Sequence, residues 1–362
     1  MPRHLVLHIG LPKTGTTSIQ RVLITKRDDL REQGYFYPRV KEGGVPQFLH
    51  KVERGGRAVQ FWRELKAEID DLPQDVSTVI LSNEQCSVAF RDTKLIGSLH
   101  DRLADRFTSI RVAVYLRRQD LHAASVFAQR LRTGRQVAPP DLASFAAEMA
   151  PFHDYEALLS RWAEVFGEAA MMPRIYARDC LPGGDVVRDF LELCGLDAEW
   201  AAQRSALQVN PSMNMEGQAM LVAIGRWEQQ QPKTSQMDAA EWAELATMIT
   251  RCCRGRGWRP HQVEAAAYLA HFTDSNEAVR RRWFPERATL FDTDMRDLPE
   301  TPLVFPEHPA PESAYAVIVD ALRVMQEKSR ASAKQERRQD RRSKRAQRSA
   351  RKAGKISSDA AG

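Results

Sequence analysis

A short glycine-bearing turn between a predicted strand and a predicted helix constrains this chain more than any other feature. The turn spans residues 10–17, reads Gly-Leu-Pro-Lys-Thr-Gly-Thr-Thr and follows the apolar run 5–9. Beyond it, Ile19, Val22 and Leu23 share one face of a helical pattern. A strand, a tight turn and a helix in this order aim several backbone N–H groups and the positive end of the helix dipole at one point. The sequence therefore predicts an anion-binding turn.

The side chains of the turn suit the same role. Gly10 and Gly15 let the backbone approach a ligand closely, because neither carries a Cβ atom. Lys13 supplies a cation, and Thr16 and Thr17 offer hydroxyl groups beside their amides. Together these groups favour a phosphate-like or sulfate-like ligand.

The position of the lysine separates two classes of enzyme. A nucleoside-triphosphate loop reads G-x-x-x-x-G-K-[ST], with its lysine after the second glycine. Gly10 and Gly15 have this separation, but Thr16 stands where the lysine belongs and Lys13 lies inside the loop. The next apolar run, 79–84, ends in Ser-Asn-Glu and lacks the aspartate that would hold magnesium. A kinase or other nucleotide-hydrolysing enzyme is therefore the alternative and not the preferred interpretation.

At these residues the chain resembles the sulfotransferases that use 3′-phosphoadenosine 5′-phosphosulfate (PAPS). Their 5′-phosphosulfate loop has the pattern P-K-x-G-T-T, which this chain also contains. The resemblance implies PAPS as cosubstrate, bound by the residues of the turn: Pro12, Lys13, Thr14, Gly15, Thr16 and Thr17.

A second segment extends the resemblance. The family binds the 3′-phosphate of the donor with an arginine at the end of a strand and a serine in the following helix. Here the apolar run 112–116 ends at Arg117 and Arg118, and Ser125 lies eight residues beyond Arg117. The spacing favours Arg117 over Arg118 as the phosphate ligand. Asn276 resembles part of a C-terminal feature of bacterial sulfotransferase-like sequences, and the carbohydrate-type branch of the family is the preferred relative.

The first half of the chain alternates between strand and helix patterns, which predicts an α/β fold with a P-loop-like parallel sheet covered by helices on both faces. The strands are expected at 4–9, 76–82, 110–116 and 170–176, and the helices at 16–31, 57–71, 93–106, 118–132 and 153–166. Ligands of such sheets bind at the carboxyl ends of the strands. Gly10, Glu84 and Arg117 each follow a predicted strand closely.

The second half is mostly helical in pattern. Residues 1–298 are expected to form the sulfotransferase domain, in which 185–290 make a helical cap. A proline-rich linker, 299–311, follows and leads to an amphipathic helix at 312–328. The last segment, 329–362, is poor in apolar residues and rich in basic ones, so we expect a disordered tail.

The charge of the chain is concentrated in this tail. Residues 328–355 carry 13 Lys or Arg and two acidic residues, a net charge of +11, which leaves −5 for the rest of a chain of net charge +6. A basic tail of this kind suits an anionic partner, such as a nucleic acid or a membrane surface, and a binding protein that acts through the tail is the second alternative function. The tail lacks the aromatic residues that stack on bases.

The sequence also predicts where the protein works. Met1 to His4 precede only a five-residue apolar run, so we expect no signal peptide, and no stretch approaches the ~18 apolar residues of a membrane-spanning helix. The number of cysteines is odd and their spacing fits neither a zinc finger nor a redox motif. A cytoplasmic location is expected. The five cysteines are Cys86, Cys180, Cys194, Cys252 and Cys253.

The resemblance implies transfer of a sulfuryl group to a hydroxyl or amine of an acceptor, which is a glycan, a lipid or a small molecule. Lys13 is the candidate that stabilises the leaving phosphate, and no metal is expected to be required. Two residues are candidates for the general base, Glu84 and His50. His8, within the first predicted strand, is expected to be a hydrogen-bonded core histidine.

Overall fold

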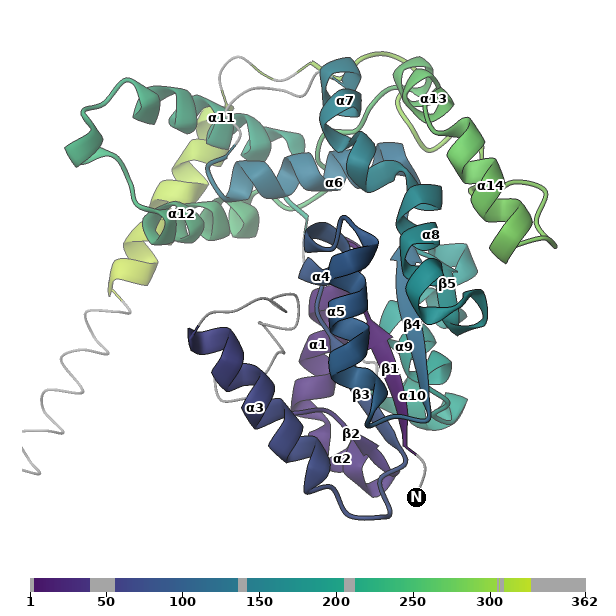
Figure 1. Cartoon of the computed structure of the whole chain (residues 1–362). Helices are drawn as coiled ribbons and strands as arrows, with labels where there is room; N and C mark the ends of the chain where they lie inside the picture. The colour runs from purple at the N-terminus through teal and green to yellow at the C-terminus, as the bar shows by residue number, and fades with distance from the viewer. Residues whose placement is uncertain are drawn as a thin grey trace, which may run out of the picture. The chain divides into compact units, whose positions relative to one another are not determined.

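The computed structural model describes residues 3–39, 56–135, 142–204, 212–304, 306 and 309–326 (Figure 1). Contacts within the chain divide it into two compact units. The first unit comprises 1–130, 138–210 and 258–304, and the second comprises 131–137, 211–257 and 305–362. The glycine-bearing turn, 10–17, belongs to the first unit.

A five-stranded parallel sheet forms the centre of the first unit, with strand order β2-β3-β1-β4-β5. The central strand, β1, is hydrogen-bonded to β3 on one side and to β4 on the other. The strands are β1 (His4–His8), β2 (Tyr35–Phe36), β3 (Thr78–Ser82), β4 (Ser109–Leu116) and β5 (Met171–Ile175). The prediction of an α/β fold with a parallel sheet is confirmed.

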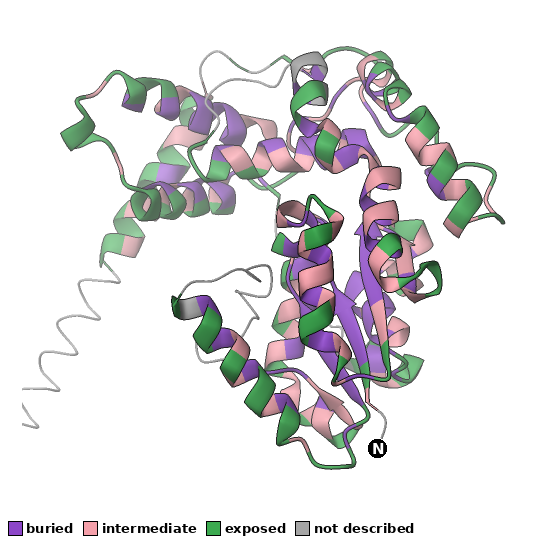
Figure 2. Ribbon diagram, in the orientation of Figure 1, coloured by how far each residue is buried: buried purple, intermediate pink, exposed green. Residues whose placement is uncertain are grey.

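Successive side chains of the central strands point to opposite faces of the sheet and enter two apolar cores. Leu5 and Leu7 belong to one core, which also receives side chains from α3, α5, α8 and α14. Val6 and Tyr115 belong to the other, which receives side chains from α1, α2, α9 and α10. Figure 2 shows the strands as the most thoroughly buried part of this unit. Burial on both faces explains why these strands are apolar at nearly every position.

Three helices of the first unit begin at an aspartate whose side-chain oxygen accepts a free N–H group of the first turn. Asp92, Asp154 and Asp185 each cap a helix in this way, accepting hydrogen bonds from Leu95 N, Ala157 N and Val187 N respectively. The helices are α1 (Thr16–Thr25), α2 (Arg27–Glu32), α3 (Gly56–Asp70), α4 (Gln85–Ala89), α5 (Thr93–Ala104), α6 (Gln119–Arg132, whose last two residues lie in the second unit), α7 (Leu142–His153), α8 (Tyr155–Phe166), α9 (Val186–Leu193), α10 (Ala198–Arg204), α13 (Gln262–Ala270) and α14 (Thr273–Trp283), with short 3-10 turns at Glu168–Ala170, Arg178–Cys180 and Pro182–Gly184.

The second unit is helical. It contains α11 (Met215–Gln229), α12 (Ala239–Cys252), a 3-10 turn at Lys233–Ser235 and a further helix over 311–326. Asp238 and Glu241 form a reciprocal capping box at the start of α12. An ion pair of 2.6 Å between Arg251 and Asp320 joins α12 to the helix at 311–326.

The predicted helix 16–31 is wrong as a single helix, because the structure ends α1 at Thr25 and starts α2 at Arg27. Thr25 Oγ1 donates a hydrogen bond to Arg21 O, four residues back. Such back-bonding bends helices, and Lys26 then leaves the helical region at φ −110°, ψ 24°. Strand β2 and helices α4 and α7 were not predicted.

Two predictions concern residues outside the described part of the chain, the tail 329–362 and the candidate base His50. The extent of the catalytic domain, 1–298, stays a prediction. Among the described residues, no helix has both the length and the apolar character needed to cross a bilayer.

Candidate functional site

The turn after β1 is held in a left-handed conformation at three positions. Gly10, Lys13 and Gly15 have φ values of 58°, 67° and 83°. Glycine adopts such angles freely, whereas a left-handed residue with a Cβ costs about 1–2 kcal/mol. Lys13 is the non-glycine residue with positive φ among the described residues. Strained backbone of this kind concentrates at functional sites.

Both glycines are also required by their surroundings. A Cβ on Gly10 would lie 2.8 Å from the Cα of Glu84, and one on Gly15 would lie 2.6 Å from Val186 Cγ1. The turn is tied together internally by Thr14, whose hydroxyl donates a hydrogen bond of 2.6 Å to Leu11 O. The turn is therefore a rigid, closely packed structure, as an anion-binding turn needs to be.

Three adjacent strands bring the predicted site residues to one edge of the sheet. Gly10 follows β1, Glu84 follows β3 and Arg117 follows β4, and these strands are neighbours in the order β3-β1-β4. Helix α1 packs on one face of the sheet and α5 on the other. Open α/β sheets bind ligands at the carboxyl ends of their strands, and this is the edge at which these residues lie.

Arg117 closes onto the turn. Its Nη1 donates a hydrogen bond of 3.0 Å to Lys13 O, and its guanidinium lies 5.5 Å from the ring centre of Tyr176. The carbonyl oxygen of Arg117 accepts a hydrogen bond of 2.6 Å from the Tyr155 hydroxyl. Burial lowers the pKa of Arg117 from its usual value, but a guanidinium stays protonated in proteins. A positive charge is thus fixed against the main chain of the turn.

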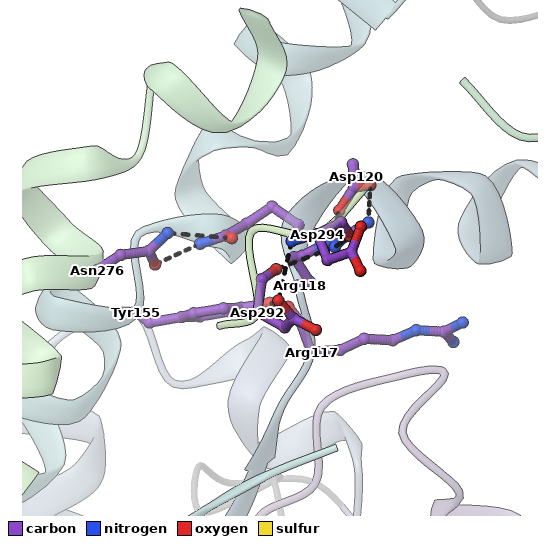
Figure 3. A network of polar contacts seen from close by, with 8 residues as sticks. Arg117, Arg118, Asp120, Tyr155, Asn276, Asp292 and Asp294 are labelled. Carbon is purple, nitrogen blue, oxygen red and sulfur yellow. Dashed lines mark hydrogen bonds and ion pairs between the residues drawn. The ribbon is translucent and has the colours of Figure 1, made fainter. Parts of the chain in front are cut away.

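Arg118 is engaged elsewhere (Figure 3). Its guanidinium forms a two-pronged ion pair with the buried Asp120, at 2.8 and 3.0 Å. Its Nη1 also donates to the carbonyl oxygens of Asp292 and Asp294, each at 3.0 Å. In Figure 3 the Arg117 side chain extends away from this network. The geometry therefore assigns a structural role to Arg118 and leaves Arg117 as the arginine at the turn.

Three buried side chains in hydrogen-bond contact, which we call the histidine chain, also contact the turn. It consists of His122, His153 and Tyr268, and His122 Nε2 lies 2.7 Å from Pro12 O. His122 Nδ1 lies 2.7 Å from His153 Nε2, and His153 Nδ1 lies 3.0 Å from the Tyr268 hydroxyl. The spacing of these residues along the sequence gave no signal for it.

The hydrogen positions in the histidine chain are fixed by its contact with the carbonyl oxygen of Pro12. Pro12 O can only accept, so His122 Nε2 carries a hydrogen. Burial lowers the pKa of His122 to about 3, which keeps its ring neutral and makes Nδ1 an acceptor. His153 must then donate from Nε2, and its Nδ1 accepts from the Tyr268 hydroxyl. Every donor points toward the turn, and the carbonyl oxygens of Pro12 and Lys13 are both held.

Ser125 lies in α6, three residues beyond His122. Residues three apart share a face of a helix, so Ser125 lies on the face from which His122 contacts the turn. Its side chain is half-buried. Ser125 thus lies in the helix that directly follows Arg117 at the end of β4.

Glu84 lies beside the turn, directly before α4. Burial raises the pKa of its carboxyl group, and the positive charge of Lys13 acts in the opposite direction. A raised pKa suits a general base at neutral pH. His8 is a buried histidine whose Nδ1 lies 2.9 Å from Ser82 Oγ, and burial lowers its pKa to about 3. The prediction that His8 is a core histidine is confirmed.

Comparisons with known proteins give distant similarities. No family model matches the chain. An uncharacterized protein of Archaeoglobus fulgidus is 28% identical over 190 residues, which cover 49% of this chain and 48% of that protein. The chain thus spans about half the length of the curated relative that it matches. A crystal structure of a sulfotransferase from Alicyclobacillus acidocaldarius aligns over 62% of this chain and 92% of its own, at 18% identity and a TM-score of 0.36.

Proposed function

We propose that the protein is a sulfotransferase that moves a sulfuryl group from PAPS to a hydroxyl or amine of an acceptor. One observation carries this proposal: the Arg117 guanidinium, delivered by β4, bonds the main chain of the Pro-Lys-Thr-Gly-Thr-Thr turn, delivered by β1. This contact supports the proposal because a ligand with anionic groups at two ends requires two cationic segments close together.

The residues present fit this donor. The amides of residues 14–17 at the start of α1 and the cation of Lys13 suit the 5′-phosphosulfate. Arg117 and Ser125 suit the 3′-phosphate, because a fork of N–H donors and a hydroxyl match its oxygens. Bound there, PAPS would supply the activated sulfuryl group.

The chain's own residues would supply the rest of the chemistry. Charge builds on the bridging oxygen of the leaving phosphate during sulfuryl transfer, so a cation at that oxygen stabilises the transition state more than the ground state. Lys13 is our candidate for that cation. Glu84, whose raised pKa and place beside the turn suit a base, would take the proton from the acceptor. The acceptor class, whether a glycan, a lipid or a small molecule, is open to a screen with radiolabelled donor.

Ligand-dependent stability tests this function without an acceptor. The product, adenosine 3′,5′-bisphosphate, should raise the melting temperature in the absence of magnesium. For a Kd of about 1 µM, ligand at about 100 µM adds ~2.7 kcal/mol to the free energy of unfolding. Stabilisation by ATP with magnesium but not by the bisphosphate would indicate the kinase or NTPase alternative. Stabilisation by neither nucleotide would contradict both enzymatic assignments and direct attention to the basic tail.

A further inference from the structure

A second pocket opens in the first unit, away from the residues assigned to PAPS. It has a volume of about 510 Å³ and lies where the junction of α7 and α8 meets the end of α4 and the junction of α13 and α14. Its walls include neither the turn, Arg117 nor Ser125. Pockets of this size hold small organic molecules. The lining residues are Arg91, Ala150, Pro151, Asp154, Ala157, Arg161, His271, Phe272 and Ser275.

Two arginines give the pocket its chemistry. Arg161 Nε is buried and has no hydrogen-bond partner among the described residues. Burial lowers the pKa of Arg161, the negative charges of Asp154 and Glu156 raise it, and the positive charge of Arg91 lowers it. Arg91 is exposed and lies 4.9 Å from the ring centre of Phe152. Two guanidinium groups in the lining of one pocket suit the binding of an anion.

The acidic residue of the pocket, Asp154, is engaged by groups other than the two arginines. Asp154 Oδ1 accepts hydrogen bonds from Ala157 N at 3.0 Å and from Ser275 Oγ at 2.8 Å. Its carboxylate is thus fixed as the cap of α8, and it balances one of the two arginine charges. The pocket lining thus contains two arginines, Arg91 and Arg161, and one acidic residue, Asp154.

The lining also includes His271 and four apolar residues. Ala150, Pro151, Ala157 and Phe272 offer hydrocarbon surface beside the two guanidinium groups. An inorganic anion alone would leave this surface uncovered, whereas a ligand with a ring and an anionic group would contact both parts.

We propose that this pocket is a second binding site, for a small organic molecule that carries a phosphate ester, sulfate ester or carboxylate on a ring. Arg91 and Arg161 bind the anionic group, and Phe272 and Pro151 contact the ring. The site stands independently of the proposed sulfotransferase function, because it shares no residue with the crevice at the turn.

Calorimetric titration of the full chain tests the site with three matched probes: phenyl phosphate, benzoate and benzyl alcohol. The two anions should bind and the neutral alcohol should not. Arg161→Gln should weaken anion binding about tenfold or more, as expected for a lost charge-assisted hydrogen bond. Arg91→Gln, on an exposed side chain, should do the same without risk to the fold. Tighter binding of phenyl phosphate or of benzoate identifies which anion the site prefers.

Two control variants separate this site from its surroundings. Arg63→Gln removes the same charge from an exposed position on α3 and should leave Kd unchanged. Lys13→Gln alters the turn and should also leave the Kd of the probes unchanged. The result therefore does not depend on whether the proposed sulfotransferase function is correct. Equal binding of benzyl alcohol, equal affinity in Arg91→Gln and Arg63→Gln, or loss of binding in Lys13→Gln would each overturn the proposal.

Discussion

Arg117 Nη1 lies 3.0 Å from Lys13 O, although the two residues are 104 positions apart in the sequence. This hydrogen bond joins the segment after β4 to the turn after β1. It also engages the Lys13 carbonyl oxygen with the arginine. The two halves of the proposed PAPS site are thus one structure, and we expect a change in either half to affect both.

Lys13→Ala should reduce turnover about a hundredfold, because loss of one preorganised charge at the transition state costs on the order of 3 kcal/mol. The affinity for adenosine 3′,5′-bisphosphate should change much less, since the product lacks the transferred group. Steady-state kinetics and calorimetry on the same preparations make the comparison. Alanine at φ 67° is strained about as much as lysine is, so the substitution leaves the backbone strain of the turn unchanged.

Lys26→Ala is the matched control for this variant. Lys26 lies just beyond the far end of α1 and pairs with Asp29 at 3.6 Å. Its loss should alter neither turnover nor affinity. Equal losses of turnover and affinity in Lys13→Ala would show that Lys13 only binds the ligand.

Glu84→Gln should lower turnover and remove the acidic limb of the pH–rate profile. Burial raises the pKa of the Glu84 carboxyl group above 4.5, so the wild-type rate should fall as the pH drops through this raised value and the base becomes protonated. His50→Gln, measured in parallel, tests the other candidate base. If Glu84→Gln keeps the wild-type acidic limb and His50→Gln loses it, the base is His50.

The buried histidines should make stability depend on pH. Burial lowers the pKa values of His8 and His122 from 6.5 to about 3, and that of His153 well below 6.5. The unfolded chain binds protons on these rings below pH 6.5 and the folded chain does not. Their contribution is therefore complete above pH 6.5 and is lost as the pH falls, by about 1.4 kcal/mol per pH unit for each ring.

Urea denaturation between pH 5 and pH 7 measures this slope. His122→Gln should make the slope shallower, whereas His4→Gln, which removes an exposed histidine, serves as the control. A His122→Gln protein with the full wild-type slope would contradict the neutral, buried state assigned to the histidine chain.

Arg118→Gln should destabilise the fold by about 3 kcal/mol or more, because it leaves the fully buried Asp120 carboxylate without its partner. The control is Arg130→Gln, which breaks a more exposed pair with Glu148 and should cost less than about 1 kcal/mol. Chemical denaturation of both variants makes the comparison. Equal, small losses would show that the network around Arg118 contributes little.

The sequence was sufficient to predict the parallel sheet and the turn, because both depend on local patterns. Apolar runs define strands that are buried on both faces, and Gly10 and Gly15 mark a turn whatever surrounds it. The strand order β3-β1-β4, which places Glu84 and Arg117 on the two strands that flank the turn, is a property of the whole fold and could not be predicted from local patterns.

The residues that support the site could not be predicted in the same way. His122, His153 and Tyr268 come from three helices, and only tertiary packing brings them into one line. The spacing to Ser125 favoured Arg117 over Arg118 in the sequence, but the contacts that engage Arg118, with Asp120 and with the chain near Asp292, are seen only in the structure.

The central claim is that Arg117 holds the 3′-phosphate while the turn holds the 5′ side of the same nucleotide. Calorimetry with adenosine 3′,5′-bisphosphate and adenosine 5′-monophosphate, on the wild type and Arg117→Gln, tests it directly. The wild type should prefer the bisphosphate by about tenfold or more, and Arg117→Gln should lose most of that preference while binding the monophosphate nearly as before. An undiminished preference for the bisphosphate in Arg117→Gln would contradict the account.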